Sequence, residues 1–306
     1  MIQRRHMLKI TAAAGGVGLF GLNSYAKTPK VHLAKWHGIA LGGTASMRVV
    51  HRDPEIANNM IKRAVSELRR LEKIFSLYDL NSSVVQLNRD GSLKMPPIEL
   101  VMLLQSARQI SKATDGLFDV SVQPLWDYYS KRSKQNQKPA PLLGQENILL
   151  NRQLITLKEG QKITLNGIAQ GAITDHLMAL FKKHGFNDIL LGTGEISASG
   201  HNEKQRPWRV ALGDKDGPKI DLQNAAVATS EAVPLKPNST LSHFFNPHTG
   251  LCENHFNRVS VIAPNATYAD GLSTALMLSE EEYWPFILDQ FKSMPLTVHF
   301  ERKDRS

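Results

Sequence analysis

The sequence predicts an α+β fold in which mixed sheets pack with helices. Apolar residues recur at helical spacing in several long segments, and short strand-like runs separate them without a regular strand-helix-strand repeat. The chain has 306 residues, of which 42% are hydrophobic and 21% are charged, as in an ordinary globular protein. This composition excludes a disordered, collagen-like or disulfide-built chain.

The N-terminal residues 1–26 have the features of a twin-arginine export signal. Arg4-Arg5 precedes a mildly apolar run, and Ser24-Tyr25-Ala26 resembles a cleavage site. The run is too short and too rich in Gly and Ala for a stable membrane span. We therefore expect a mature domain over residues 27–306 and a periplasmic location. An ordinary export signal, or anchoring by an uncleaved segment, is the alternative.

Charge and cysteine content limit the classes of partner and site. The formal net charge is +9 at pH 7, but the basic residues are scattered and are not interleaved with aromatic residues on one helix, so nucleic acid is not expected as a partner. Cys252 is the only cysteine, which excludes an intramolecular disulfide and a thiolate metal cluster. The polar, basic stretch near residues 130–141 predicts an exposed loop and a possible subdomain boundary.

The first half of the mature domain is expected to contain a strand, two helices and a hairpin. Ile39 to His51 has strand composition, and Pro54 to Phe75 has the spacing of a long amphipathic helix that starts with proline. Glu99 to Ala113 is the second predicted helix. Gln153 to Leu165 is predicted as a hairpin that turns at Glu159-Gly160.

The second half is expected to alternate helices with short buried strands. A helix is predicted from Gln170 to His184, where Gly185 ends it, and another from Ala269 to Ser279. The predicted strands are Asp188 to Leu191, Trp208 to Leu212 and Val259 to Ala263.

A glycine-rich segment, Gly192-Thr193-Gly194-Glu195, follows one of these strands. It resembles the opening of a dinucleotide-binding fingerprint, but Ser197 occupies the place of the third glycine and no helix clearly follows. A Rossmann fold is therefore not predicted. The glycines permit either a close backbone approach to a ligand or a tight turn between strands, and the spacing favours the turn.

The segment from His243 to His255 contains three histidines, Cys252 and Glu253. A transition-metal site is conceivable, although the spacing matches no familiar zinc pattern. Asn246 to Gly250 is a turn sequence that would place His248 on the surface. His243 precedes this turn and is either a buried structural histidine or an active-site base.

Asp270 and Thr274 are four residues apart in a predicted helix and so lie on one face. A carboxylate and a hydroxyl on one face suit Mg²⁺, which prefers oxygen ligands. The alternative is that Asp270 caps the helix and Thr274 faces the core.

Taken in order, these motifs resemble those of the ApbE family, the FAD:protein FMN transferases. The resemblance covers roughly residues 40–280 and implies an ApbE-like flavin transferase fold. Its motifs are Gly43-Thr44, Phe75-Ser76-Leu77-Tyr78-Asp79, Thr114 to Val122, Asn166-Gly167-Ile168-Ala169-Gln170-Gly171, Gly192-Thr193-Gly194-Glu195, Ser242 to Gly250, and Ala269-Asp270 with Thr274-Ala275.

The resemblance implies an enzyme that binds FAD and Mg²⁺. It would transfer FMN to a Ser or Thr of an acceptor flavoprotein and release AMP. The implied acceptor is a subunit of a membrane or periplasmic electron-transport complex. A cation offsets the charge of the FAD pyrophosphate, and a neutral imidazole can accept the proton of the acceptor hydroxyl.

The resemblance also implies a role for particular residues. His243 would be the catalytic base, and Gly167 (through its carbonyl), Asp270 and Thr274 would hold Mg²⁺. The residues implied to bind FAD are Tyr78, Leu117, Phe118, Asp119, Gln170, Gly194 and Phe245.

The chain departs from the family pattern close to this implied site. Thr164 stands where the family commonly has an aspartate, and Gln170 where it has lysine or glutamate, so each position lacks a charge. A divergent enzyme that serves one dedicated acceptor fits this mixture. The alternatives are an Mg²⁺-dependent FAD pyrophosphatase that yields FMN and AMP, and a noncatalytic FAD-binding accessory protein.

Overall fold

The structure is a computed structural model that describes residues 31–130, 143–213, 216–235 and 242–303. The predicted export signal and nearly all of the basic stretch near residues 130–141 lie outside these residues. Within the described residues, no helix is long and apolar enough to cross a membrane.

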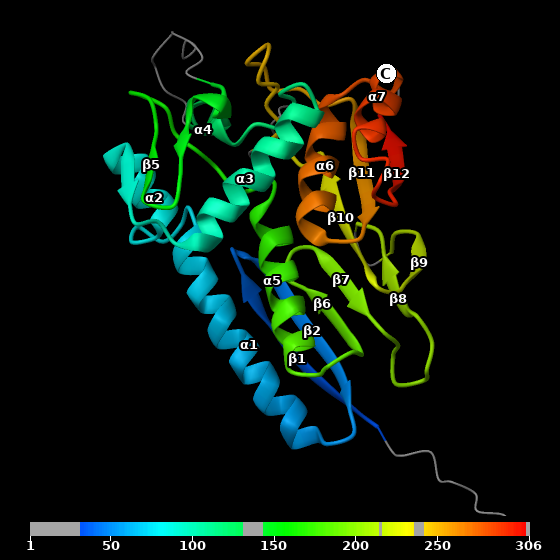
Figure 1. Cartoon of the computed structure of the whole chain (residues 1–306). Coiled ribbons are helices and arrows are strands. Elements are labelled where there is room, and N and C mark those ends of the chain that lie inside the picture. The colour runs from blue at the N-terminus through cyan, green and yellow to red at the C-terminus, as the bar shows by residue number, and fades with distance from the viewer. Residues whose placement is uncertain (1–30, 131–142, 214–215, 236–241, 304–306) are drawn as a thin grey trace, which may run out of the picture. The chain divides into compact units, whose positions relative to one another are not determined.

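The largest sheet has seven strands in the order β1-β2-β6-β7-β10-β11-β12, and each neighbouring pair is antiparallel (Figure 1). Its strands are β1 (His32–Ala40), β2 (Gly43–His51), β6 (Ile189–Gly192), β7 (Ile196–Ser199), β10 (Ala225–Glu231), β11 (Phe256–Ala263) and β12 (Thr297–Arg302). Two small sheets contain β3 (Ser92–Lys94), β5 (Leu154–Thr156) and β4 (Leu149–Leu150), and β8 (Trp208–Ala211) with β9 (Lys219–Leu222).

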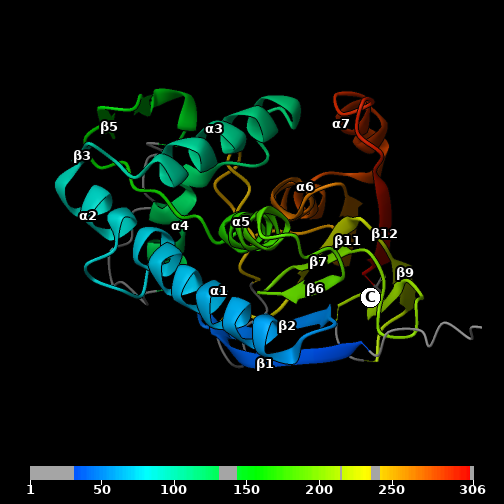
Figure 2. The same ribbon diagram turned by 60° about the horizontal axis from the view of Figure 1, so that its bottom comes forward.

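Helices cover the large sheet on one face. Figure 2 shows α1, α5 and α6 side by side over this sheet, and each contacts the two strands beneath it. The helices are α1 (Pro54–Phe75), α2 (Ser83–Asp90), α3 (Ile98–Ala113), α4 (Gln123–Ser130), α5 (Ala169–Lys183), α6 (Ala266–Leu278) and α7 (Trp284–Asp289). The predicted α+β class, with helices packed on sheets, is confirmed.

Helix α1 has the boundaries that the sequence predicts. The Oδ1 atom of Asp53 accepts hydrogen bonds from the backbone N–H groups of Glu55 (2.8 Å) and Ile56 (3.1 Å), which caps the helix. Pro54 occupies the first turn, where no N–H donor is needed. Its apolar stripe is buried, and Leu68 and Leu71 are among the largest fully buried side chains.

The predicted strand from Ile39 to His51 is instead parts of two strands. Leu41 (φ +47°) and Gly42 (φ +84°) form a tight turn between β1 and β2, which pair from His32 with His51 to Ala40 with Gly43. A positive φ at these two positions matches the hairpin turns that join antiparallel strands.

The predicted hairpin from Gln153 to Leu165 is wrong in its second half. Only Leu154–Thr156 forms a strand, and it pairs with β3 on one side and β4 on the other. Ile163, later in this segment, bonds to a side chain and not to a strand. The side-chain amide of Asn88 accepts from the Ile163 N–H (2.7 Å) and donates to the Ile163 carbonyl (2.8 Å). A side chain distant in sequence thus replaces the partner strand.

Candidate active site

One pocket brings together most of the residues that the resemblance implies for the site. Its walls come from the loop before α4, from the segment before α5, from the segment of His243 and from the second half of α6. The lining residues are Leu117, Phe118, Asp119, Val120, Val122, Trp126, Thr164, Asn166, Gly167, His243, Phe244, Phe245, Thr274 and Leu278.

His243 lies in the wall of this pocket. Its Nδ1 atom is 3.4 Å from the carbonyl oxygen of Val233, and its ring lies 4.3 Å from the ring of Phe244. Burial lowers the pKa of His243 below its usual value of 6.5. The imidazole is therefore neutral at neutral pH, which is the state that a general base requires.

An aromatic cluster supports the segment that carries His243. The Phe245 ring stacks on Tyr129 at 5.5 Å and meets Trp126 edge-on at 6.1 Å. The Tyr129 hydroxyl donates to the carbonyl of Gly250 (3.2 Å), so α4 holds both ends of this segment. Trp126 and Tyr129 are not among the residues predicted from the sequence, although the run of aromatic residues in α4 could have indicated them.

The segment after Phe245 forms the predicted turn. Oδ1 of Asn246 accepts from the N–H groups of His248 (2.9 Å) and Thr249 (3.3 Å), and His248 is exposed. Among the described residues, no group of three or more His, Cys, Asp and Glu side chains could hold a metal ion. The side chains from His243 to His255 thus do not converge into such a group.

Asp119 fixes the loop that lines the pocket. Its carboxylate accepts from the backbone N–H groups of Ser121 (2.7 Å), Gly144 (3.1 Å) and Gln145 (3.3 Å). Burial raises the pKa of Asp119, and these donors partly offset the effect of burial. The Asp119 carboxylate thus stabilises the protein's own backbone through these hydrogen bonds. Its implied contact with FAD stays a prediction.

Asp270 and Thr274 lie inside α6. This helix begins at Ala266, before the predicted start, and Asn265 caps it by accepting from the Tyr268 N–H (3.0 Å). Asp270 is therefore not a helix cap, and that alternative is wrong. A Cβ atom added to Gly167 would lie 2.9 Å from Oγ1 of Thr274, so the Gly167 backbone closely approaches this hydroxyl.

The donor types at this position fit Mg²⁺. They are the carboxylate of Asp270, the hydroxyl of Thr274 and the carbonyl of Gly167, and Mg²⁺ prefers such oxygen ligands. Burial is the main cause that raises the pKa of Asp270 to about 7, and the negative charge of Asp175 adds to it. No ion pair to Asp270 occurs in the described part of the chain. A bound cation would stabilise this buried carboxylate.

Three of the implied FAD-binding residues, Tyr78, Gln170 and Gly194, are not in the pocket lining. Gln170 lies in the first turn of α5, where it contacts Gly194. A Cβ added to Gly194 would lie 2.2 Å from Cδ of Gln170, and one on Gly43 would lie 3.4 Å from its Nε2. Gly194 (φ +101°) is in the turn between β6 and β7, which confirms the turn interpretation of the glycine-rich segment. Tyr78 is 74% exposed and lies near Gly42.

Glu195 was not among the predicted site residues. It is buried, and its Oε2 accepts from the Thr229 N–H at 3.2 Å. Burial raises the pKa of Glu195, and the negative charge of Asp270 raises it further. An acidic residue directly after a glycine turn of a buried hairpin was the available sequence indication.

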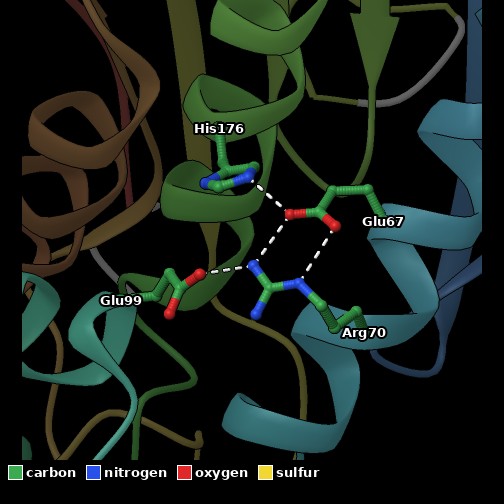
Figure 3. Close-up of polar contacts among 4 residues, drawn as sticks. All are labelled: Glu67, Arg70, Glu99 and His176. Carbon is green, nitrogen blue, oxygen red and sulfur yellow. Dashed lines mark hydrogen bonds and ion pairs between the residues drawn. The ribbon is translucent and has the colours of Figure 1, made fainter.

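An ionic network ties α1, α3 and α5 together (Figure 3). Arg70 of α1 bonds both oxygens of Glu67 (2.8 and 3.0 Å) and also Glu99 of α3. His176 of α5 completes the network, with its Nε2 2.7 Å from Oε1 of Glu67. The bond to Arg70 is the main cause that lowers the pKa of Glu67. The network therefore holds α5, whose first turn carries Gln170.

Two relatives have sequences similar to this chain over most of its length. The FAD:protein FMN transferase of Salmonella typhimurium (strain LT2) is 26% identical over 269 residues, which is 79% of this chain and 77% of the relative. The FAD:protein FMN transferase of Escherichia coli (strain K12) is 25% identical over 283 residues, 83% of this chain and 80% of the relative.

Solved structures of flavin transferases share the fold. The apo form of the flavinyl transferase ApbE from Pseudomonas stutzeri has a TM-score of 0.75 and 23% identity, and the match covers 90% of this chain and 92% of that one. A mutant of the flavin transferase ApbE from Vibrio cholerae has a TM-score of 0.76 and 19% identity, covering 90% and 95%. The expected ApbE-like fold is thus confirmed.

A model of the ApbE family matches residues 41–297. This match includes the pocket, the turn between β6 and β7, and all of α6. The chain therefore belongs to the ApbE family.

Proposed function

We propose that this protein catalyses the Mg²⁺-dependent transfer of FMN from FAD to a Ser or Thr hydroxyl of a partner flavoprotein, with release of AMP. The observation that carries the proposal is a half-buried, neutral His243 in the same pocket as Gly167 and Thr274. The relatives named FAD:protein FMN transferase support flavin transfer as the reaction.

His243 acts as the base of the reaction. A neutral ring that donates its Nδ1 hydrogen to the Val233 carbonyl keeps Nε2 free to accept a proton. Nε2 takes the proton from the acceptor hydroxyl as its oxygen attacks the phosphorus of the FMN half of FAD. The new bond is a phosphoester, the bond that breaks is the pyrophosphate P–O bond, and AMP leaves with the electron pair.

Asp270, Thr274 and the carbonyl of Gly167 would hold Mg²⁺. When bound, the ion offsets the charge of the pyrophosphate oxygens and stabilises the leaving AMP. The loop fixed by Asp119 places Leu117 and Phe118 in the pocket wall. Apolar walls that exclude water would favour transfer to a docked acceptor over attack by water.

A twin-arginine signal over residues 1–26 would export the folded protein to the periplasm. The acceptor would then be an exported flavoprotein subunit of a membrane or periplasmic electron-transport complex. Covalent attachment suits such a subunit, because a bound FMN cannot diffuse away from it.

The test is an incubation of the mature protein with FAD and Mg²⁺, with and without acceptor domains from exported flavoproteins. AMP release is followed together with the mass of the acceptor. We expect the acceptor to gain one FMN as AMP is released, and both to stop when the metal is chelated. AMP release without acceptor modification would instead establish a pyrophosphatase, and bound FAD without AMP a noncatalytic binder.

A further inference from the structure

Glu195 and Asp270 are two buried carboxylates on different elements. Glu195, in the turn between β6 and β7, is 8% exposed, and Asp270 of α6 is 5% exposed. Each has one oxygen that accepts a single backbone hydrogen bond, Oε2 of Glu195 from Thr229 (3.2 Å) and Oδ2 of Asp270 from Gly171 (3.0 Å). In the described part of the chain, the other oxygen of each carboxylate has no hydrogen-bond partner.

Contacts between neighbouring residues connect the surroundings of the two carboxylates. The Ser230 hydroxyl lies 2.8 Å from the Ser273 hydroxyl, and this contact joins β10 to α6. Ser230 directly follows Thr229, whose N–H donates to Glu195. Gln170 contacts Gly194, the residue before Glu195, and Gly171 bonds Asp270. Burial raises the pKa of Glu195, and the negative charge of Asp270 raises it further, as a nearby like charge does.

Two like charges buried together are costly unless a cation or a proton compensates them. Neither carboxylate has an ion pair with a lysine, arginine or histidine of the described residues. In the protein without FAD, the donors assigned to Mg²⁺ so far, Asp270, Thr274 and Gly167, supply only one negative charge for a doubly charged ion. A second carboxylate would balance the ion and raise the affinity of the site.

We propose that Glu195 supplies the second carboxylate of the Mg²⁺ site, through the oxygen that has no protein partner. The proposal rests on the proposed function, because it concerns the ion that FMN transfer would use. It assigns Glu195 a role in holding the ion and none in accepting the proton of the acceptor hydroxyl.

The test measures metal binding without FAD and without an acceptor. Mn²⁺ binding is followed by the electron paramagnetic resonance of the free ion, and Mg²⁺ binding by calorimetry. We expect Glu195→Gln to weaken binding of both ions at least tenfold, and Asp270→Asn to abolish it. Glu203→Gln, at an exposed turn, is the control that removes a carboxylate elsewhere and should bind like the wild type.

Thermal unfolding separates a metal ligand from a structural residue. In EDTA, Glu195→Gln should unfold at the wild-type temperature or above, because it removes repulsion between buried charges. The increase in Tm caused by saturating Mn²⁺ should shrink in this variant. If Glu195→Gln binds Mn²⁺ like the wild type, Glu195 is not a ligand of the ion and the proposal is overturned.

A second variant keeps the test decisive if Glu195→Gln does not fold. Glu195→Asp retains the charge but shortens the side chain, so Mn²⁺ binding should weaken several-fold without being lost. Unchanged affinity in Glu195→Asp would then count against the proposal. If wild-type protein binds neither ion, the Mg²⁺ dependence of the proposed function fails; if only Asp270→Asn loses binding, the role of Glu195 alone fails.

Discussion

The backbone N–H of Gly171 donates a hydrogen bond to Oδ2 of Asp270, with 3.0 Å between the two atoms. This bond joins the first turn of α5 to the middle of α6. One turn further along α5, Asp175 accepts from the backbone N–H groups of Ala266 (2.7 Å) and Thr267 (2.8 Å) at the start of α6. The contact between α5 and α6 thus positions the carboxylate that we assign to Mg²⁺.

Gly171→Ala should separate these two helices. A Cβ at this position would lie 2.3 Å from the carbonyl oxygen of Ala266, and a backbone atom cannot rotate out of the way. We expect the free energy of unfolding to fall by about 1–3 kcal/mol, as for other overpacked interiors. Gly271→Ala is the matched control, since its Cβ would meet only the side-chain end of Ile110. Equal losses in urea unfolding of the two variants would contradict this explanation.

Asp270→Asn should change how stability depends on pH in the metal-free protein. The pKa of Asp270 is raised from 3.8 to about 7, so the folded protein holds this proton more tightly than the unfolded chain. The resulting stability is present at low pH and is lost as pH rises toward about 7. In EDTA, the variant should therefore be more stable than the wild type at pH 8, by at least about 1 kcal/mol. A less stable variant at this pH would argue against an uncompensated buried charge.

His243→Gly should remove FMN transfer and leave FAD binding intact. Loss of a general base lowers the rate by about 10²- to 10⁴-fold. Added imidazole should restore part of the rate, because the vacated space can admit a free ring that accepts the same proton. FAD binding is measured by the change in flavin fluorescence. Loss of FAD binding together with transfer would identify His243 as a structural residue.

As the pH is lowered, the rate of FMN transfer should begin to fall at a lower pH than it would if the base were a histidine of ordinary pKa. Burial lowers the pKa of His243 below 6.5, so the neutral base persists until the pH falls through this lowered value. The acidic limb of the profile of kcat/KM against pH should therefore bend below pH 6.5. The measurement uses saturating Mg²⁺ and wild-type enzyme. A bend above pH 6.5 would mean that another group controls the reaction.

Arg70→Met should weaken the network of Figure 3. The side chain of Arg70 is 44% exposed, so solvent screening limits the expected loss of unfolding free energy to about 1 kcal/mol at pH 7. Arg70 lowers the pKa of Glu67, so the stabilisation is present above pH 4.5 and is lost as pH falls through that lowered value. The difference between variant and wild type should therefore shrink in acid.

The control for Arg70→Met is Arg209→Met, which breaks the exposed pair with Asp221 on β8 and β9. Its effect should stay within a few tenths of a kcal/mol, since exposed ion pairs contribute little. Urea unfolding at pH 7 and pH 4 gives both differences. If the two variants lose the same stability, the network does not hold the helices together more firmly than an ordinary surface pair.

Elements with strong local patterns were predictable from the sequence. Pro54–Phe75 is a helix with the predicted ends, because its apolar spacing, its proline and its Asp53 cap all act within the segment. The hairpin predicted from Gln153 to Leu165 failed because the bonds of Ile163 go to Asn88, far away in the sequence. Local pattern cannot identify a backbone partner that only folding brings near.

The same distinction applies to the site. The sequence by itself determined the residue types and their order, and the resemblance implied roles for His243, Asp270 and Thr274. Only the tertiary structure decided that Asp119 is bound by backbone donors and that burial, with the charge of Asp270, raises the pKa of Glu195. The reason is physical: burial and the charge of neighbours set the protonation and the free oxygens of a carboxylate, and both arise when distant segments pack together.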